Sequence, residues 1–146
     1  KEKYEEILSN IPLEGALAWL SGHFGPDFST YDLDEYVQNI EIPGIQGLFE
    51  SIIYAKGGDP ITVKEAALYY AMGMGMPILY GSAADIADKI EYFVDEGGAD
   101  GFMLIASYTP GCYEEFVDMV VPELQRRGRY RTEYTGSTLR ENLLAF

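Results

Sequence analysis

The chain has 146 residues, of which 47% are apolar and 23% are charged, proportions that are usual for a globular protein and exclude a disordered one. Its 24 acidic and 10 basic residues give a formal net charge of −14, which repels phosphate backbones and anionic lipids, so neither nucleic acid nor a membrane surface is an expected partner. The single cysteine, Cys112, excludes an internal disulfide framework and a cysteine-based zinc site, and with only one histidine we expect no metal site.

Charge is divided unevenly along the chain. Residues 1–122 carry 21 acidic and 5 basic side chains, whereas residues 123–146 carry 3 acidic side chains and 5 arginines. Opposite charges attract, so we expect the arginine-bearing tail to dock on the acidic body of its own or a neighbouring chain.

Neither a membrane span nor a secretion signal is evident. The longest uncharged run, residues 66–82, is too short to cross a bilayer and is interrupted by Gly73, Gly75 and Pro77. The first six residues hold no apolar signal core. We therefore expect a cytoplasmic protein.

The first elements are helical. Apolar residues at 4, 7, 8 and 11 form one stripe of a helix, and a second stripe follows Pro12 and is expected to stop at Gly22. The first stripe has neither an initiator methionine nor a capping residue before it, so the chain is expected to begin within a helix.

An irregular stretch runs from Gly22 to about Gly47. Gly, Pro, Asp and Ser punctuate it, while Phe24, Phe28 and Tyr31 give it apolar surface to bury. Loops of this length in compact domains are usually functional, and the aromatic content favours an excursion packed on a body over a free linker. A short helix is expected over residues 46–55.

Two capping boxes mark the next helices. Thr62 and Glu65 begin a helix that ends near Gly73, and Ser82 and Asp85 begin another that ends at the Gly97-Gly98 pair. Between these helices, residues 78–80 predict a very short strand. The last long helix is expected to open at Thr109-Pro110 and to end at Gly128.

A continuous apolar run, Phe102–Ala106, predicts a strand buried on both faces. In the last long helix, Pro122 lies inside the helical pattern and is expected to kink it. From residue 78 the order is therefore strand, helix, strand, helix, which is typical of a parallel α/β sheet. A strand buried on both faces needs a neighbouring strand on each side, and only residues 78–80 are available, so two interpretations remain. Either the domain is mostly helical with a token strand, or the rest of the sheet lies in polypeptide missing from this chain, which the uncapped start favours.

The C-terminal half resembles the end of a flavin-dependent monooxygenase of the bacterial-luciferase-like superfamily, in its nitrilotriacetate, dibenzothiophene-sulfone and long-chain alkane monooxygenase branch. The dense part of the resemblance covers residues 81–142, and a looser match covers residues 3–6 and 20–29. The segments that carry it are Gly81-Ser82-Ala83-Ala84-Asp85-Ile86-Ala87-Asp88, Gly98-Ala99-Asp100-Gly101-Phe102-Met103-Leu104, and Phe116-Val117-Asp118-Met119-Val120-Val121-Pro122-Glu123-Leu124-Gln125-Arg126-Arg127-Gly128.

This resemblance implies that the chain is the C-terminal part of a (β/α)8 TIM-type barrel, helix-rich and with few strands of its own. Residues 1–146 would form one partial barrel domain, in which residues 12–60 are an insertion over the barrel mouth. Residues 61–77 would be a helix, residues 78–128 the final β/α units, and residues 129–146 a C-terminal tail.

The resemblance also implies the chemistry. The family uses reduced FMN, delivered by a separate NAD(P)H-dependent flavin reductase, and O2 adds to the flavin to oxygenate a small organic substrate. The flavin-holding segments of the family lie outside this chain, so no flavin-binding residue is assigned here. The expected partners are the remainder of the barrel, the reductase, the substrate with O2, and further copies of the chain in a homo-oligomer.

Candidate site residues follow from the barrel mouth, where such enzymes bind substrate. His23 is the catalytic candidate, because imidazole can hydrogen-bond a substrate or a developing peroxide near neutral pH. The alternative for His23 is a loop histidine with one backbone hydrogen bond. Phe24, Tyr80, Ser107 and Tyr108 are the substrate-binding candidates.

Other residues are given structural roles. Met103 and Ile105 are expected to lie in the core, and Cys112 is expected to be a packing residue. The acidic residues at 32, 34 and 35 are expected to form a solvated turn.

The leading interpretation is a segment of an FMN-dependent monooxygenase that neither binds FMN nor turns over alone. The alternatives are a truncated, non-catalytic relative acting as an oligomerisation or interaction module, and a mostly helical regulatory domain.

Overall fold

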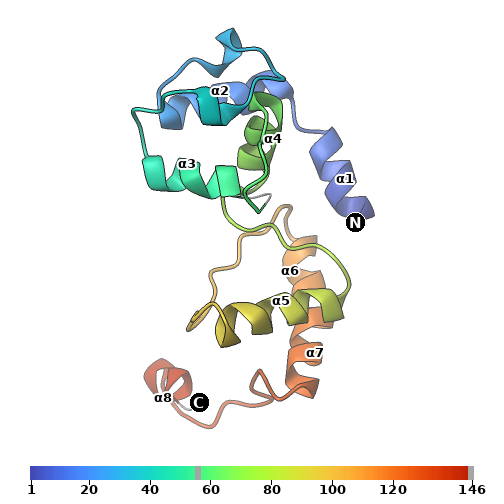
Figure 1. Cartoon of the computed structure of the whole chain (residues 1–146). Helices are drawn as coiled ribbons and strands as arrows, with labels where there is room; N and C mark the ends of the chain where they lie inside the picture. The colour runs from blue at the N-terminus through green and yellow to red at the C-terminus, as the bar shows by residue number, and fades with distance from the viewer. Residues whose placement is uncertain (55–56, 145–146) are drawn as a thin grey trace. The chain divides into compact units, whose positions relative to one another are not determined.

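The computed structural model describes residues 1–54 and 57–144, and the chain divides into two compact units, residues 1–78 and residues 79–146 (Figure 1). Ala55, at the end of the expected short helix, lies outside the described residues.

In the first unit, the described residues form α-helices α1 to α4 and the 3₁₀ turns η1 and η2. Its helix α2 packs against α4, which lies beside α3 (Figure 1). The helices are α1 (Glu2–Ser9), α2 (Leu13–Phe24), α3 (Gln46–Ile53) and α4 (Val63–Gly73), and the 3₁₀ turns are η1 (Phe28–Thr30) and η2 (Val37–Asn39).

Two helix ends test the sequence expectations directly. The capping box of α4 is confirmed: the Glu65 N–H donates to Thr62 Oγ1 (3.2 Å), and the Thr62 N–H donates to Glu65 Oε2 (3.0 Å). The expected stop of α2 at Gly22 is wrong, because α2 continues to Phe24 and ends at Gly25, whose φ of 101° suits glycine.

The irregular stretch between α2 and α3 packs on the helices, as its aromatic content predicted. Phe28, Val37 and Ile40 are buried in one apolar core with residues of α2, α3 and α4. Backbone hydrogen bonds hold it there: the Val37 N–H donates to the Ile61 carbonyl (3.0 Å), and the Val63 N–H donates to the carbonyl of Glu35 (2.9 Å). This stretch is therefore part of the folded unit.

The second unit has a much smaller apolar core. Helix α5 lies across one long helical rod, with Ala87, Val120 and Leu124 buried between them. The capping box of Ser82 and Asp85 is confirmed at the start of α5. The elements are α5 (Ala83–Asp95), α6 (Gly111–Glu115), a π-helical segment η4 (Phe116–Val120), α7 (Val121–Arg126) and α8 (Leu139–Leu143).

The rod formed by α6, η4 and α7 is disturbed close to its proline. Pro122 has no N–H to donate one turn back, and its ring crowds the carbonyl there. The helix takes a π-helical course over Phe116–Val120, directly before α7, which carries Pro122 in its first turn. The disturbance expected at Pro122 is thus a widened turn.

The two expected strands, residues 78–80 and 102–106, are wrong as strands: both are irregular in the structure. A strand needs a neighbour for its N–H and C=O groups, and the described residues contain no strand, only an isolated antiparallel bridge between Tyr36 and Thr62 in the first unit. The described chain is helix-rich, and the parallel sheet of an α/β barrel is not formed within it.

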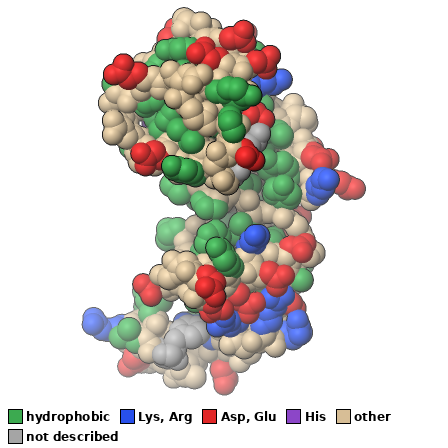
Figure 2. Space-filling model, viewed as in Figure 1, with side chains coloured by type: hydrophobic (Ala, Val, Ile, Leu, Met, Phe, Trp, Pro, Cys, Tyr) green, Lys and Arg blue, Asp and Glu red, His purple; other side chains and the backbone are tan. Residues whose placement is uncertain are grey.

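The arginine-bearing tail docks on the acidic body of its own chain, which confirms one of the two expected arrangements. Figure 2 shows acidic and basic side chains gathered side by side on the second unit. Arg129 donates to Glu91 (3.1 Å) and to Asp95. Arg127 lies between three carboxylates, those of Asp88 (2.6 Å), Glu91 (2.6 Å) and Glu123 (2.8 Å).

Acid should weaken the second unit through Glu123. Hydrogen bonds from Arg126 and Arg127 lower the pKa of this carboxyl from 4.5 to about 2. A lowered folded-state pKa contributes stability that is complete above the unfolded value of 4.5 and is lost as the pH falls towards 2. We therefore expect hydrogen-exchange protection of α5 and α7 to be steady from pH 7 to about pH 5 and to decline below it.

Two variants isolate this contribution. Glu123→Gln removes the titrating group and should flatten part of the acid dependence, whereas Glu114→Gln, on the exposed surface of α6, should not. Equal acid dependence in the Glu123→Gln variant and the unchanged chain would show that this cluster does not govern the decline.

Candidate functional site

His23 lies in the last turn of α2 and is exposed, not in a loop as expected. Its Nδ1 is 3.1 Å from the carbonyl oxygen of Trp19, one turn earlier. We assign the proton to Nδ1, because a carbonyl oxygen can only accept, and this leaves Nε2 as the acceptor of the neutral ring. Within the described residues, this is the one hydrogen bond of His23, so its other nitrogen is available to a ligand.

Phe24, the adjacent substrate-binding candidate, is fully buried. Its ring packs edge-to-face against Phe49 and against Tyr70, each with a centroid distance of 5.1 Å. Phe24 therefore holds the core directly beneath His23, and its predicted contact with a substrate stays a prediction.

Tyr70 of α4 completes this neighbourhood and was missed as a site residue by the sequence analysis. Its ring packs edge-to-face on His23 at a centroid distance of 5.5 Å and is fully buried. Burial raises the pKa of the Tyr70 hydroxyl, an effect that the nearby Trp19 indole N–H, as a hydrogen-bond donor, partly offsets. Among the described residues, no group accepts the hydroxyl proton in hydrogen-bonding geometry. The phenol is thus a neutral, buried donor with an unused proton.

The other three candidates belong to the second unit. Tyr80 is half-exposed and precedes the cap of α5, and Ser107 is exposed. The Tyr108 hydroxyl donates to Glu115 Oε2 (2.7 Å), and a Cβ on Gly111 would lie 2.9 Å from the Tyr108 ring. The Tyr108 ring therefore lies close to the start of α6, with its hydroxyl bonded to the same helix. The candidates are divided between the two units, and their assembly into one site stays a prediction.

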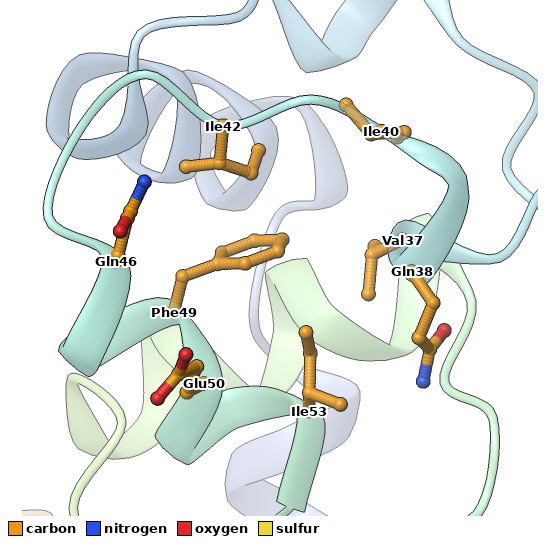
Figure 3. Close-up of a pocket in the computed structure, with 8 residues that line it drawn as sticks. All are labelled: Val37, Gln38, Ile40, Ile42, Gln46, Phe49, Glu50 and Ile53. Atoms are coloured by element: carbon orange, nitrogen blue, oxygen red, sulfur yellow. The ribbon is translucent and has the colours of Figure 1, made fainter.

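A hollow of about 330 Å³ in the first unit was not anticipated from the sequence (Figure 3). Its volume is at the lower end of the range for small-molecule sites. Phe49 contributes to its wall while touching Phe24 with its ring. The only feature of the sequence that could have indicated this hollow is the set of apolar residues in the irregular stretch. The lining combines apolar residues with three polar ones: Val37, Gln38, Ile40, Ile42, Gln46, Phe49, Glu50 and Ile53.

The described residues offer little to a metal or a phosphate. They contain no group of three histidine, cysteine or carboxylate side chains placed to hold a metal ion. Of the arginines, Arg126, Arg127 and Arg129 are already paired with carboxylates, so they do not fit the phosphate of FMN. None of the described helices is both long enough and apolar enough to cross a bilayer.

Comparison with known proteins gives consistent matches. Dimethyl-sulfide monooxygenase of Hyphomicrobium sulfonivorans is 38% identical over 142 residues, which are 97% of this chain and 30% of that protein. Nitrilotriacetate monooxygenase component A of Aminobacter aminovorans is 37% identical over 146 residues, 98% of this chain and 32% of that protein.

A solved structure agrees with these relatives. The crystal structure of DmoA from Hyphomicrobium sulfonivorans matches 99% of this chain and 30% of that chain, with a TM-score of 0.79 and 37% identity. No family model matches the chain. The chain thus spans about 30% of the length of the curated relatives that it matches.

Proposed function

Because this chain belongs to the bacterial-luciferase-like superfamily of flavin-dependent monooxygenases, in the branch of the nitrilotriacetate, dibenzothiophene-sulfone and long-chain alkane enzymes, we propose that it works as the C-terminal segment of an FMN-dependent monooxygenase. The longer protein would oxygenate a small organic substrate with O2. It would receive reduced FMN from a separate NAD(P)H-dependent flavin reductase, and it would work as a homo-oligomer in the cytoplasm.

The exposure pattern of residues 102–105 is the observation that carries this proposal. Phe102 and Leu104 are 42% and 43% exposed, and Phe102 packs on Phe93 of α5. Met103 and Ile105, which alternate with them in the sequence, are 95% and 71% exposed. A barrel strand has one face against helices and the other inside the barrel. The segment has its helix-covered face, and the remainder of the barrel would supply the other.

Within the proposed enzyme, the first unit supplies the cover of the barrel mouth. Residues 12–60 form this insertion, and the hollow of Figure 3 lies within it. His23 would accept or share a proton with the substrate through Nε2, because Nδ1 is engaged by the Trp19 carbonyl. The first unit thus brings a proton-handling group and an apolar recess to the mouth.

The second unit would supply the end of the last barrel strand. Tyr80, Ser107 and Tyr108 would line the substrate pocket there. The Tyr108 hydroxyl donates to Glu115, which fixes the position of the ring that would contact the substrate. FMN would be bound by the rest of the protein, and Arg126, Arg127 and Arg129 of this chain are already paired with carboxylates.

The test compares this chain with the protein encoded by its complete reading frame. We expect the longer protein to bind FMN and, with a flavin reductase and NADH, to consume O2 and form an oxygenated product. This chain alone should do neither. In the longer protein, His23→Ala should lower product formation by about 10²-fold or more while FMN binding is kept.

Two results would overturn the proposal. FMN binding by the isolated 146-residue chain would place the flavin site within it. A reading frame that yields only a 16.3 kDa protein without bound FMN would favour the non-catalytic interaction module instead.

A further inference from the structure

The Tyr70 hydroxyl is an anomaly of the first unit. Buried polar groups in folded proteins are nearly always hydrogen-bonded, because a donor that leaves water without finding a partner destabilises the fold. The Tyr70 ring is fully buried, and no group among the described residues accepts the proton of its hydroxyl. Phenylalanine would fill the same space without this cost. Packing alone therefore does not explain a tyrosine at position 70.

Two exposed side chains of α2 lie over this buried ring. Trp19 and His23 stand one turn apart, with a ring-centroid distance of 5.6 Å, and the His23 ring contacts the Tyr70 ring. Trp19 also acts on the Tyr70 hydroxyl, since its indole opposes the effect of burial on the pKa. An indole N–H, a phenol O–H and an imidazole nitrogen thus converge at one place on the unit.

We propose that Trp19, His23 and Tyr70 form a binding site for a neutral organic compound with a hydrogen-bond-accepting oxygen, and that the Tyr70 hydroxyl donates to this oxygen. The Trp19 indole N–H is a second donor, and Phe24 and Phe49 provide apolar surroundings. The ligand is the substrate or product only if the function proposed above is correct.

The charges of the chain favour a neutral ligand over an anion. The first arginine of the sequence is Arg126, so the first unit offers no guanidinium to a carboxylate or phosphate. Trp19 and Tyr70 are uncharged donors, and the chain as a whole carries a charge of −14. A carbonyl, sulfoxide or sulfone oxygen matches this donor set.

A ligand reaches the Tyr70 hydroxyl only if a neighbouring side chain moves. The hydroxyl is covered in this structure, and the half-exposed Trp19 beside it is the side chain that would have to move. The ligand oxygen then meets a donor that has no bond to break. Binding to an unsatisfied donor gains more than the usual exchange of hydrogen bonds with water.

The experiment uses the 146-residue chain and its one tryptophan, whose indole N–H gives a single cross-peak in a ¹H–¹⁵N spectrum. The probe is tetrahydrothiophene 1,1-dioxide, and the control ligand is tetrahydrothiophene, the same ring without oxygen. We expect the oxygenated ring to shift the Trp19 indole resonance saturably. The oxygen-free ring should not shift it comparably.

Two tyrosine variants make the test specific. Tyr70→Phe removes the unpartnered hydroxyl, and we expect it to weaken binding of the oxygenated ring about tenfold or more while the melting temperature stays equal or rises by about 2–4 °C. Tyr69→Phe removes a neighbouring hydroxyl that donates to the Met76 carbonyl (3.1 Å) and should leave this affinity within about twofold.

Each outcome decides the matter. The proposal is overturned if neither ring shifts the indole resonance, if both shift it equally, or if Tyr70→Phe binds as tightly as the unchanged chain. The measurement needs no flavin, so its result is separate from the test of the proposed function. Saturable, Tyr70-dependent binding combined with a longer protein that lacks flavin-dependent oxygenation would retain the site and reject the enzyme.

Discussion

Replacing Phe24 with alanine will destabilise the first unit by about 3–5 kcal/mol, the range measured for truncating a fully buried phenylalanine. The Phe24 ring is completely buried and packs on the rings of Phe49 and Tyr70. Aromatic neighbours cannot collapse into the space that the ring leaves, since each is rigid and also packs against other side chains. The cost is therefore expected to stay within this range and not to fall below it.

The measurement is urea denaturation followed by the fluorescence of Trp19, which lies in α2 five residues before Phe24. Tyr54→Ala is the matched control, because Tyr54 is an aromatic residue of the same unit that is largely exposed, and we expect a change within about 0.5 kcal/mol. A loss of less than about 1 kcal/mol for Phe24→Ala would show that the ring is not part of a packed core.

Ile105→Glu will have opposite outcomes in the short chain and in the longer protein that we propose. In the 146-residue chain the side chain is mostly exposed, so a glutamate should change stability by no more than about 0.5 kcal/mol. Inside a closed barrel the same position faces the packed interior, where an unpaired carboxylate has no partner and costs several kcal/mol. We expect the longer variant to be insoluble or to melt far below the unchanged protein.

Thermal melts of both lengths check this expectation, with Thr132→Glu as the control. Thr132 is exposed in the tail, and a glutamate there should be tolerated at both lengths. If Ile105→Glu were equally harmless in the longer protein, this segment would not be an interior strand. The proposed place of the chain in a barrel would then be wrong.

The helices of this chain were largely predictable because the signals that begin and end them are local. Thr62 with Glu65, and Ser82 with Asp85, specify helix starts within four residues, and both capping boxes form. Gly22 does not end α2, because a glycine inside a helix destabilises it by only about 1 kcal/mol. The helix ends instead at Gly25, where the backbone adopts a positive φ.

The strand at residues 102–106 was not realised because strand pairing depends on residues far away in sequence. The apolar residues of this segment can be read from its sequence, but the described residues contain no neighbouring strand with which it could pair. The family relationship, by contrast, was confirmed from ordered strings of residues, which persist whether or not a neighbouring strand is present.

The candidate site was only partly accessible to sequence reasoning. His23 is the sole histidine and was therefore easily selected. The unpartnered hydroxyl of Tyr70 depends on three-dimensional neighbours, and in the sequence Tyr70 is one more apolar position of a helix. The hydrogen bond between Tyr108 and Glu115 joins a loop to a helix, so the helical or strand periodicity of the sequence does not predict it.

The ion cluster around Arg127 implies that the two units respond to dissolved salts in opposite senses. The first unit is stabilised mainly by buried apolar surface, which sulfate and similar salts strengthen because they are excluded from protein surfaces. The second has only three buried apolar residues among those described and depends on partly exposed charge pairs, which any electrolyte screens. A sulfate salt is therefore a selective means of loosening one half of this chain while tightening the other.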